Sequence, residues 1–427
     1  MKYDVNEYQL KNGGRGLIIN VPGAPVFASQ FSFRAGARFV KNYREKSETA
    51  HIMEHMAFGT SGDFANANAY ETSFTKNGAF YNANTTDTGM TYIANCADFE
   101  WDRILKLQQS AICRPRFTEE EFKAEFGNVK SELTGYLSDA GWVLWPRMSQ
   151  ELGEDTKTIQ EGLDSMANIS VEDIREHYAR THTAGNMRFV VAGDFAGRLT
   201  KLREILNDFD LSEGERLPIP VDEMHSAPAF TIRRKDVPSI SFEISLILPR
   251  RLSDEENSAM ALLNHILNGT VYHSRIQGAA RERGLLYYMW SNTSANEHNS
   301  SWDFGGEASA EKLPAVIDLI VGEMKKILDG EVDDQDLDEA KSYALGRHQM
   351  GVQTTAQLNQ WFANRYFFDG RIEDFEKQPD RIRGVSREKI INTAREFFRA
   401  DTWSLGLYGN TDKALADKLH EKFAKLF

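Results

Sequence analysis

The stretch Ala50-His51-Ile52-Met53-Glu54-His55-Met56 decides how the rest of this 427-residue chain is interpreted. If it forms a helix, His51 and His55 lie one turn apart on the same face, with Glu54 close to both. Two imidazoles at this spacing can hold one side of a tetrahedral zinc ion, and a neighbouring carboxylate can take the proton of a metal-bound water. The alternative is a polar helix with two surface histidines.

Length and composition indicate a globular protein of more than one domain. A chain of 427 residues is too long for one ordinary core. Its 41% hydrophobic and 26% charged residues are typical of soluble proteins. No apolar run approaches the roughly 20 residues of a membrane span. Without such a run no membrane partner is expected, and the net charge of -13 would repel the phosphates of a nucleic-acid partner.

Features of the start of the chain and of its cysteines favour a cytoplasmic location. The first residues, Met1 to Glu7, lack the apolar core of a signal peptide. Cys96 and Cys113 are the only cysteines, too few for a disulfide framework. We therefore expect reduced thiols and a cytoplasmic protein, unless a leader precedes residue 1.

Strands and helices are expected on both sides of the histidine stretch. The β-rich runs 17–21 and 26–33 precede it, separated by a proline turn. Ser47 is a fair N-cap for the histidine helix, which should end near Gly59. Two strands follow at 79–85 and 90–94, and Thr118 begins a capping box that opens a helix to about Leu137.

This long helix carries two carboxylates of interest, Glu125 and Glu132. They are seven residues apart and therefore lie near the same face. As a metal ligand, Glu132 would complete a His2Glu set with a fourth position for water. Glu125 would then orient one of the metal ligands through a hydrogen bond without touching the metal itself. Spacing alone does not establish these roles, because glutamate is common in helices and usually solvated.

The second half of the chain repeats the first in the same order. Glu54–Thr60 aligns with Asn264–Thr270 at an offset of 210 (264 − 54), and the strand at 26–33 matches 240–247. Residues 405–410 echo 190–194 at an offset of 216 (409 − 193). Such a series predicts a duplicated α+β domain. We expect a first domain at 1–210, a proline-containing linker at 211–230 and a second domain at 231–427.

The second copy serves as an internal control. Ala261 and Asn264 stand in place of His51 and Glu54, about Arg347 stands in place of Glu132, and only His265 persists. A purely structural role gives no reason for these polar residues to change as a set. A metal site that is present once per chain explains why these residues differ between the two copies.

In these features the chain resembles the M16 or pitrilysin-like zinc peptidases, the inverzincins, along essentially its whole length. His-x-x-Glu-His is their inverted zinc-peptidase signature, matched within Ala50–Thr60. Family members carry the third ligand 76 or 77 residues after the second histidine, which here is Glu132 (132 − 55 = 77), and a further upstream glutamate, here Glu125. The resemblance implies one zinc per chain on His51, His55 and Glu132, with Glu54 as the base.

The same resemblance implies a fold, a substrate site and a partner. The fold would be a duplicated α/β sandwich of two homologous domains. The edge strand Asn-Ala-x-Thr of the family is matched by Asn82, Ala83, Asn84 and Thr85, to which a peptide substrate would add as an extra strand. In the short members two such chains close like a clamshell around a chamber. This chain would then be half of a homodimer or a heterodimer.

Family members also use an arginine and a tyrosine from a domain without zinc to stabilise the tetrahedral intermediate. Counting forward from 274–275 places the arginine on Arg281, whereas counting backward from Gly284 places it on Ala280. Arg281 therefore pairs with Tyr287 at a spacing of six or with Tyr288 at the usual seven. In a helix, one residue rotates a side chain by about 100°. A surface arginine with a core tyrosine is the alternative, and a partner chain could supply the pair.

The sequence thus favours a zinc endopeptidase acting on peptides or short unfolded segments. One rival is a non-catalytic structural or partner subunit on the same fold, which would usually lack a complete ligand set. Another is a metal-dependent protein that binds peptides without cutting them. The substrate identity is not encoded in these motifs, and a His2Glu site also accepts cobalt or manganese.

Overall fold

The structure is a computed structural model that describes residues 1–62, 64, 66–269 and 274–427, so Thr270 of the predicted repeat lies outside the described residues. The chain folds into two compact units. Unit 1 comprises Met1–Tyr136, Lys157–Pro220 and Gly351–Glu373. Unit 2 comprises Leu137–Thr156, Val221–Met350 and Asp374–Phe427.

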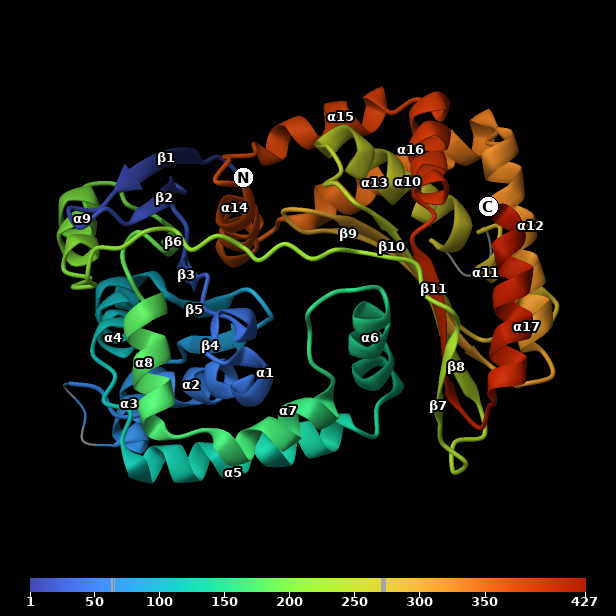
Figure 1. Cartoon of the computed structure of the whole chain (residues 1–427). Coiled ribbons are helices and arrows are strands. Elements are labelled where there is room, and N and C mark those ends of the chain that lie inside the picture. Colours follow the sequence, from blue (N-terminus) through green and yellow to red (C-terminus); the bar gives the residue numbers. More distant parts are fainter. Residues whose placement is uncertain (63, 65, 270–273) are drawn as a thin grey trace. The chain divides into compact units, whose positions relative to one another are not determined.

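Unit 1 is built on a mixed sheet (Figure 1). Within the described residues its strand order is β1-β2-β6-β3-β5-β4, where only β2 and β6 run parallel. The strands are β1 (Asp4–Gln9), β2 (Arg15–Asn20), β3 (Val26–Phe33), β4 (Phe80–Thr85), β5 (Met90–Ala97) and β6 (Met187–Gly193). Strand β4 therefore forms one edge of the sheet.

Unit 2 repeats this sheet. Its described strands follow the order β7-β11-β8-β10-β9, with β7 and β11 parallel, as in the series β2-β6-β3-β5-β4 of unit 1. They are β7 (Phe230–Arg233), β8 (Ile240–Leu248), β9 (Met289–Ala295), β10 (Ser300–Ala308) and β11 (Trp403–Gly409). The duplicated α+β fold is confirmed. Strand β1, a polar and mostly exposed strand, was not predicted because it lacks the apolar alternation of a half-buried strand.

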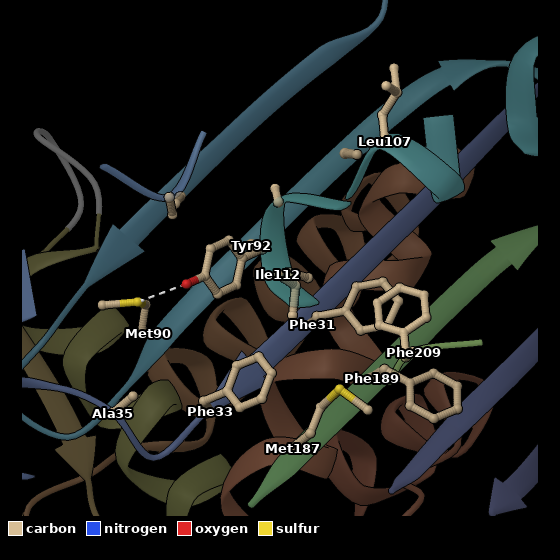
Figure 2. Close-up of a cluster of buried hydrophobic side chains, with 14 of the residues drawn as sticks. Phe31, Phe33, Ala35, Met90, Tyr92, Leu107, Ile112, Met187, Phe189 and Phe209 are labelled. Atoms are coloured by element: carbon tan, nitrogen blue, oxygen red, sulfur yellow. Dashed lines mark hydrogen bonds between the residues drawn. The ribbon is translucent and has the colours of Figure 1, made fainter. Parts of the chain in front are cut away.

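The core of unit 1 lies on one face of its sheet. Alternate residues of β3, including Phe31 and Phe33, point into it because side chains of a strand alternate between faces. The Phe31 ring stacks on that of Phe209 with centroids 4.5 Å apart, and the centroid of the Phe189 ring lies 5.8 Å from that of Phe31 (Figure 2). Helices α4 (Trp101–Cys113), α8 (Val171–Thr181) and α9 (Leu199–Asn207) cover this core.

The opposite face of each sheet is covered by a helix from the other half of the sequence. In unit 2, α6 (Ala140–Glu151) packs Leu144 and Met148 against Ile247 and Tyr408. In unit 1, α14 (Thr355–Asp369) packs on β2 and β6, and the Asn359 amide donates to the carbonyls of Ala28 and Val190. The compact units therefore differ from the continuous ranges 1–210 and 231–427.

The remaining helices complete the two units. They are α1 (Tyr43–Lys46), α2 (Thr49–Ala57), α3 (Ala67–Thr75), α5 (Glu119–Tyr136), α7 (Ile159–Ser165), α10 (Asp254–Asn268), α11 (Gln277–Glu282), α12 (Leu313–Asp329), α13 (Asp334–Gly351), α15 (Gln378–Gly384), α16 (Arg387–Ala400) and α17 (Lys413–Phe423). Among the helices described, none combines the length and the apolar character needed to span a bilayer.

Two of the predicted helix starts have different outcomes. The Thr118 capping box is confirmed, because the Thr118 hydroxyl accepts from the Glu121 amide and the Glu121 carboxylate accepts from the Thr118 amide. The Ser47 N-cap is wrong. Helix α1 precedes it, its own backbone is helical, and its hydroxyl bonds to that of Ser165 at 3.1 Å.

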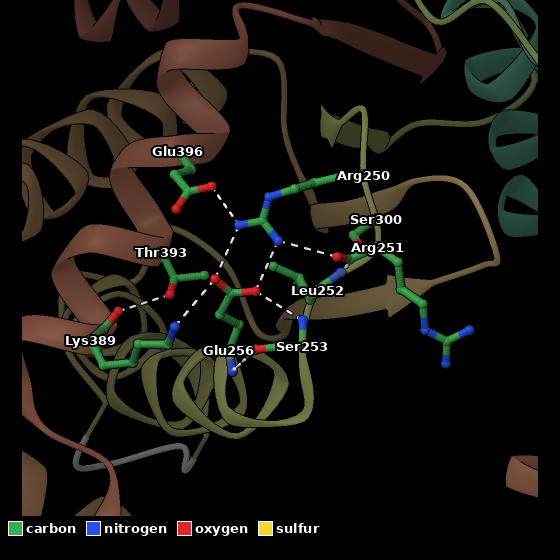
Figure 3. A network of polar contacts seen from close by, with 9 residues as sticks. All are labelled: Arg250, Arg251, Leu252, Ser253, Glu256, Ser300, Lys389, Thr393 and Glu396. Carbon is green, nitrogen blue, oxygen red and sulfur yellow. Dashed lines mark hydrogen bonds and ion pairs between the residues drawn. The ribbon is translucent and has the colours of Figure 1, made fainter. Parts of the chain in front are cut away.

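A network of ion pairs fixes the start of α10 to α16 in unit 2 (Figure 3). Arg250 donates to Glu256 at 2.9 Å and to Glu396 at 2.5 Å, and Lys389 adds a bond of 3.2 Å to Glu256. Glu256 also accepts from the Ser253 amide in a capping box. The bond from Arg250 is the main reason why the pKa of Glu256 falls to about 2.

Candidate metal centre

Two helices of unit 1, α2 and α5, pack against each other and carry the candidate site (Figure 1). On α2 the side chains of Ile52, Met53 and Met56 are buried in the core. At 100° per residue the opposite face then holds His51, Glu54 and His55. Burial of the apolar face of α2 fixes the orientation of the helix and therefore the direction in which its polar face points. The same stretch of sequence thus determines both the packing of the helix and the position of the site.

Glu132 of α5 meets the two histidines of α2. Its Oε2 lies 3.4 Å from Nε2 of His55 and 3.9 Å from Nε2 of His51. One ligand atom from each of the three residues lies within 4.8 Å of the others, and in the described part of the chain no second such set occurs. Donors on a tetrahedral zinc with bonds of about 2.0–2.1 Å are about 3.3 Å apart, so these residues fit the ion.

Two further carboxylates orient the imidazole rings. Nδ1 of His51 lies 3.0 Å from Glu48 Oε2, and Nδ1 of His55 lies 3.2 Å from Glu125 Oε2. A hydrogen bond at Nδ1 leaves Nε2 of each ring for a metal. Glu125 occupies the place expected for it. Glu48 was missed, although its position three residues before His51 at a helix start was a usable signal.

A third supporting residue, Tyr136, holds the other side of Glu132. Its hydroxyl donates to Glu132 Oε1, which leaves Oε2 facing the histidines. This bond raises the pKa of Tyr136 to about 12. Tyr136 lies one turn after Glu132 on α5, and that spacing was the only signal in the sequence.

Glu54 is partly buried beside the two histidines, and these surroundings shift the pKa of its carboxyl group. Burial raises its pKa, whereas His51, His55 and the nearby Thr85 side chain lower it without cancelling that effect. For His51, burial lowers the pKa, but the Glu48 carboxylate and other acidic neighbours outweigh it and the net shift is upward. The site thus holds a carboxylate within the same polar cluster as the ligand atoms.

Strand β4 forms a sheet edge next to this site. It pairs with β5 on one side only, within the described residues, and it contacts α2. Asn82 and Asn84 are exposed, Ala83 is buried and Thr85 lies beside Glu54. An edge strand presents unpaired backbone groups that can accept another strand.

Arg281, Tyr287 and Tyr288 lie in unit 2. Helix α11 ends at Glu282 and Gly284 has a φ of +61°, so both tyrosines follow the helix in a loop and the predicted helical rotation between them does not apply. The Arg281 guanidinium lies 4.7 Å from the ring centroid of Tyr287. Tyr287 is 78% exposed and Tyr288 58% exposed, so neither is the core tyrosine that we considered.

The corresponding position in unit 2 is a neutral hydrogen-bonded cluster. Asn264 donates to the Thr293 hydroxyl at 2.9 Å and accepts from the Trp302 indole at 2.8 Å. The His265 ring stacks on Tyr343 at 3.9 Å between centroids. These hydrogen bonds pair both ends of the Asn264 amide, with no carboxylate at the position of Glu54, as the internal control from the sequence leads us to expect.

Two family models match the chain. The model described as Insulinase (Peptidase family M16) matches residues 20–150, and the model described as Peptidase M16 inactive domain matches residues 168–343. The first range contains every candidate metal ligand. The second contains none of them and covers Arg281, Tyr287 and Tyr288.

Individual relatives match over most of their length. An uncharacterized zinc protease of Rickettsia felis is 22% identical over 95% of this chain and 97% of its own. A protein of Helicobacter pylori named non-peptidase homolog YmxG is 23% identical over 71% of this chain and 70% of its own. The crystal structure of a protease from Helicobacter pylori has a TM-score of 0.83 at 17% identity, over 95% of this chain and 100% of that one. This structure supports the same two-domain fold.

Proposed function

The protein belongs to peptidase family M16, and on that premise we propose that it is a zinc-dependent endopeptidase acting on peptides or short unfolded segments. The observation that carries the proposal is the meeting of His51, His55 and Glu132, from two helices, within 4.8 Å. Bound zinc would act as a Lewis acid on the scissile carbonyl and lower the pKa of water.

The remaining residues of the site have distinct proposed roles. Glu54 accepts the proton of the attacking water and passes it to the leaving amine, which requires a carboxylate next to the reacting atoms. Glu48 and Glu125 hold the imidazoles through Nδ1, and Tyr136 holds Glu132. These contacts fix the ligand atoms before substrate arrives.

The edge strand β4 is the proposed substrate-binding element. A peptide that adds to it through backbone hydrogen bonds would bind with little dependence on its side chains. We further propose a second M16-type chain as partner, in a homodimer or a heterodimer. Arg281 with Tyr287 would stabilise the oxyanion of the tetrahedral intermediate. A cytoplasmic location remains our expectation from the sequence.

A second candidate function is a non-catalytic partner subunit. It is favoured by the name of the Helicobacter pylori relative and by the inactive-domain model. That model, however, matches 168–343, whereas the ligands and Glu54 lie in 20–150. A complete donor set with its supporting carboxylates favours the peptidase.

Mass spectrometry of a peptide mixture incubated with the zinc-loaded chain tests the proposal. We expect new internal cleavage products, which disappear when a chelator removes the metal. Intact peptides that co-purify with the chain would identify a binding protein instead. Absence of cleavage by the chain alone and with any co-purifying partner would favour the non-catalytic subunit.

A further inference from the structure

Unit 2 contains a cavity of about 390 Å³ between the start of α6 and its sheet. Its walls include Leu144 of α6, Glu243 of β8, Trp290 of β9, Glu307 of β10 and the loop residues Tyr287 and Tyr288. All of these residues belong to unit 2, and none is a candidate metal ligand. A volume of this size is at the lower end for small-molecule pockets, so it suits one side chain or a small molecule.

The carboxyl group of Glu243 is the unusual feature of this cavity. The residue is 3% exposed, and its Oε1 has no hydrogen-bond partner in the described part of the chain. Buried polar atoms are nearly always paired, so an orphan carboxyl oxygen at a cavity wall indicates a missing partner. The neighbouring acid, Asp303, does not fill that place, because its oxygens accept from the hydroxyls of Ser245 and Ser301.

The other walls supply aromatic surface. Trp290 packs directly onto Gly305 of β10, where a Cβ atom would lie 2.3 Å from its ring, so glycine is needed for the indole to occupy this position. Tyr287 and Tyr288 add exposed rings at the wall. Aromatic faces attract cations, and the Arg281 guanidinium already lies 4.7 Å from the Tyr287 centroid.

We propose that this cavity binds an organic cation, whose guanidinium or ammonium group pairs with Glu243 while its apolar stem lies against Trp290 and the two tyrosines. Among the described residues that line it, two carry carboxyl groups and none is a lysine or an arginine, so the lining favours a cation over an anion. A neutral apolar ligand would leave Glu243 unpaired. The cation is either an arginine or lysine side chain of a peptide or a free small molecule.

The charge state of Glu243 fits this inference. Burial, and then the nearby Asp303, raises the pKa of Glu243 to about 8. A bound cation stabilises the ionised form, so binding near pH 7 should release a proton. Calorimetry in buffers with different heats of ionisation detects this release separately from binding itself.

The test is isothermal titration calorimetry on the full-length Glu54→Gln chain, which prevents cleavage of peptide probes. The probes are agmatine, acetyl-Gly-Arg-Gly-amide and the same peptide with citrulline, which has the shape of arginine but no charge. We expect the arginine peptide, agmatine or both to bind, and the citrulline peptide to bind at least about tenfold more weakly. Binding of the peptide alone identifies a peptide side chain as the source, and binding of agmatine alone identifies a free cation.

Glu243→Gln is the decisive variant, and Glu307→Gln, an exposed acid on the same wall, is its matched control. Loss of a charged hydrogen bond predicts about 10- to 150-fold weaker binding for Glu243→Gln, with a smaller change for Glu307→Gln. Trp290→Leu should also weaken binding while it keeps the carboxyl group. The inference would be overturned if neither agmatine nor the arginine peptide bound the Glu54→Gln chain, if the citrulline peptide bound as tightly as a bound arginine peptide, or if Glu243→Gln left the binding of the cation unchanged. Because binding is measured without turnover, the result is independent of the proposed peptidase activity.

Discussion

Glu132 Oε2 lies 3.4 Å from Nε2 of His55, although the two residues are 77 positions apart (132 − 55) and belong to different helices. This contact is made between α2 and α5, which pack together in unit 1. With this contact the two histidines of the motif on α2 and Glu132 of α5 form one set of three possible metal donors. The account of the function depends on it.

Glu54→Gln should separate catalysis from metal binding. The amide keeps the shape of the side chain but cannot accept the proton of the attacking water, so the rate should fall by at least about 100-fold. Zinc content should stay unchanged, because Glu54 is not among the three donors. Peptide turnover and metal analysis on the same preparation check both parts. Glu120→Gln, an exposed glutamate of α5, is the control, and near-normal turnover by Glu54→Gln would refute its role as the base.

Glu125→Gln should weaken metal binding without removing it. The carboxylate of Glu125 lies 3.2 Å from Nδ1 of His55, and this contact lowers the pKa of Glu125 itself. Loss of such a supporting group reduces metal affinity by about 10- to 100-fold in other sites. Competition with a chromophoric chelator measures the change. An affinity equal to that of the parent chain would show that Glu125 does not position the ring.

Much of the site could be predicted from the sequence, because its information is local. The apolar residues of α2 place His51, Glu54 and His55 on one face, and the capping box at Thr118 sets the start of α5. The repeat offsets were sufficient to predict the duplicated fold. These features depend on residues within two or three helical turns of one another, or on simple repetition.

The rest depends on contacts that spacing does not encode. The apolar stripe Leu144, Met148 and Leu152 indicates that α6 buries one face, but not that this face packs on the sheet of unit 2. The hydrogen bond from Tyr136 to Glu132 could not be predicted, because it depends on the side-chain rotamer of Glu132. Helix α11 ends at Glu282, and Gly284 then takes a positive φ. The rotation expected between the two tyrosines assumed that the helix continues to them, which it does not.

Glu243→Gln should stabilise unit 2 most at alkaline pH. In the folded chain the pKa of Glu243 is raised to about 8 from an ordinary 4.5. The free energy of unfolding therefore falls as pH rises between these values, because there the carboxyl group ionises in the unfolded chain but stays protonated in the folded one. The gain from the variant should be absent near pH 4.5 and reach at most about 5 kcal/mol above pH 8. Thermal unfolding followed at pH 5 and pH 9 checks the difference. A gain that is equal at both pH values would contradict it.

Glu256→Gln should have the opposite pH dependence. The folded-state pKa of Glu256 is lowered to about 2, so its ion pairs stabilise the protein above about pH 4.5 and are lost as pH falls toward 2. With solvent screening considered, we expect a loss of about 1 kcal/mol at pH 7, or about 2–4 °C in Tm. Thermal unfolding between pH 7 and pH 3 measures it. A Tm difference that widens on acidification would contradict the assignment.

Zinc content of Glu132→Ala tests the central claim most directly, with Glu120→Ala as the matched control on the same helix. The account predicts one zinc per chain in the parent protein and in the control, and a loss of affinity greater than about 100-fold in Glu132→Ala, beyond the effect of removing a supporting residue. The His51→Ala variant should lose zinc in the same way. Full stoichiometric zinc in Glu132→Ala, at an affinity equal to that of the parent chain, would contradict the claim.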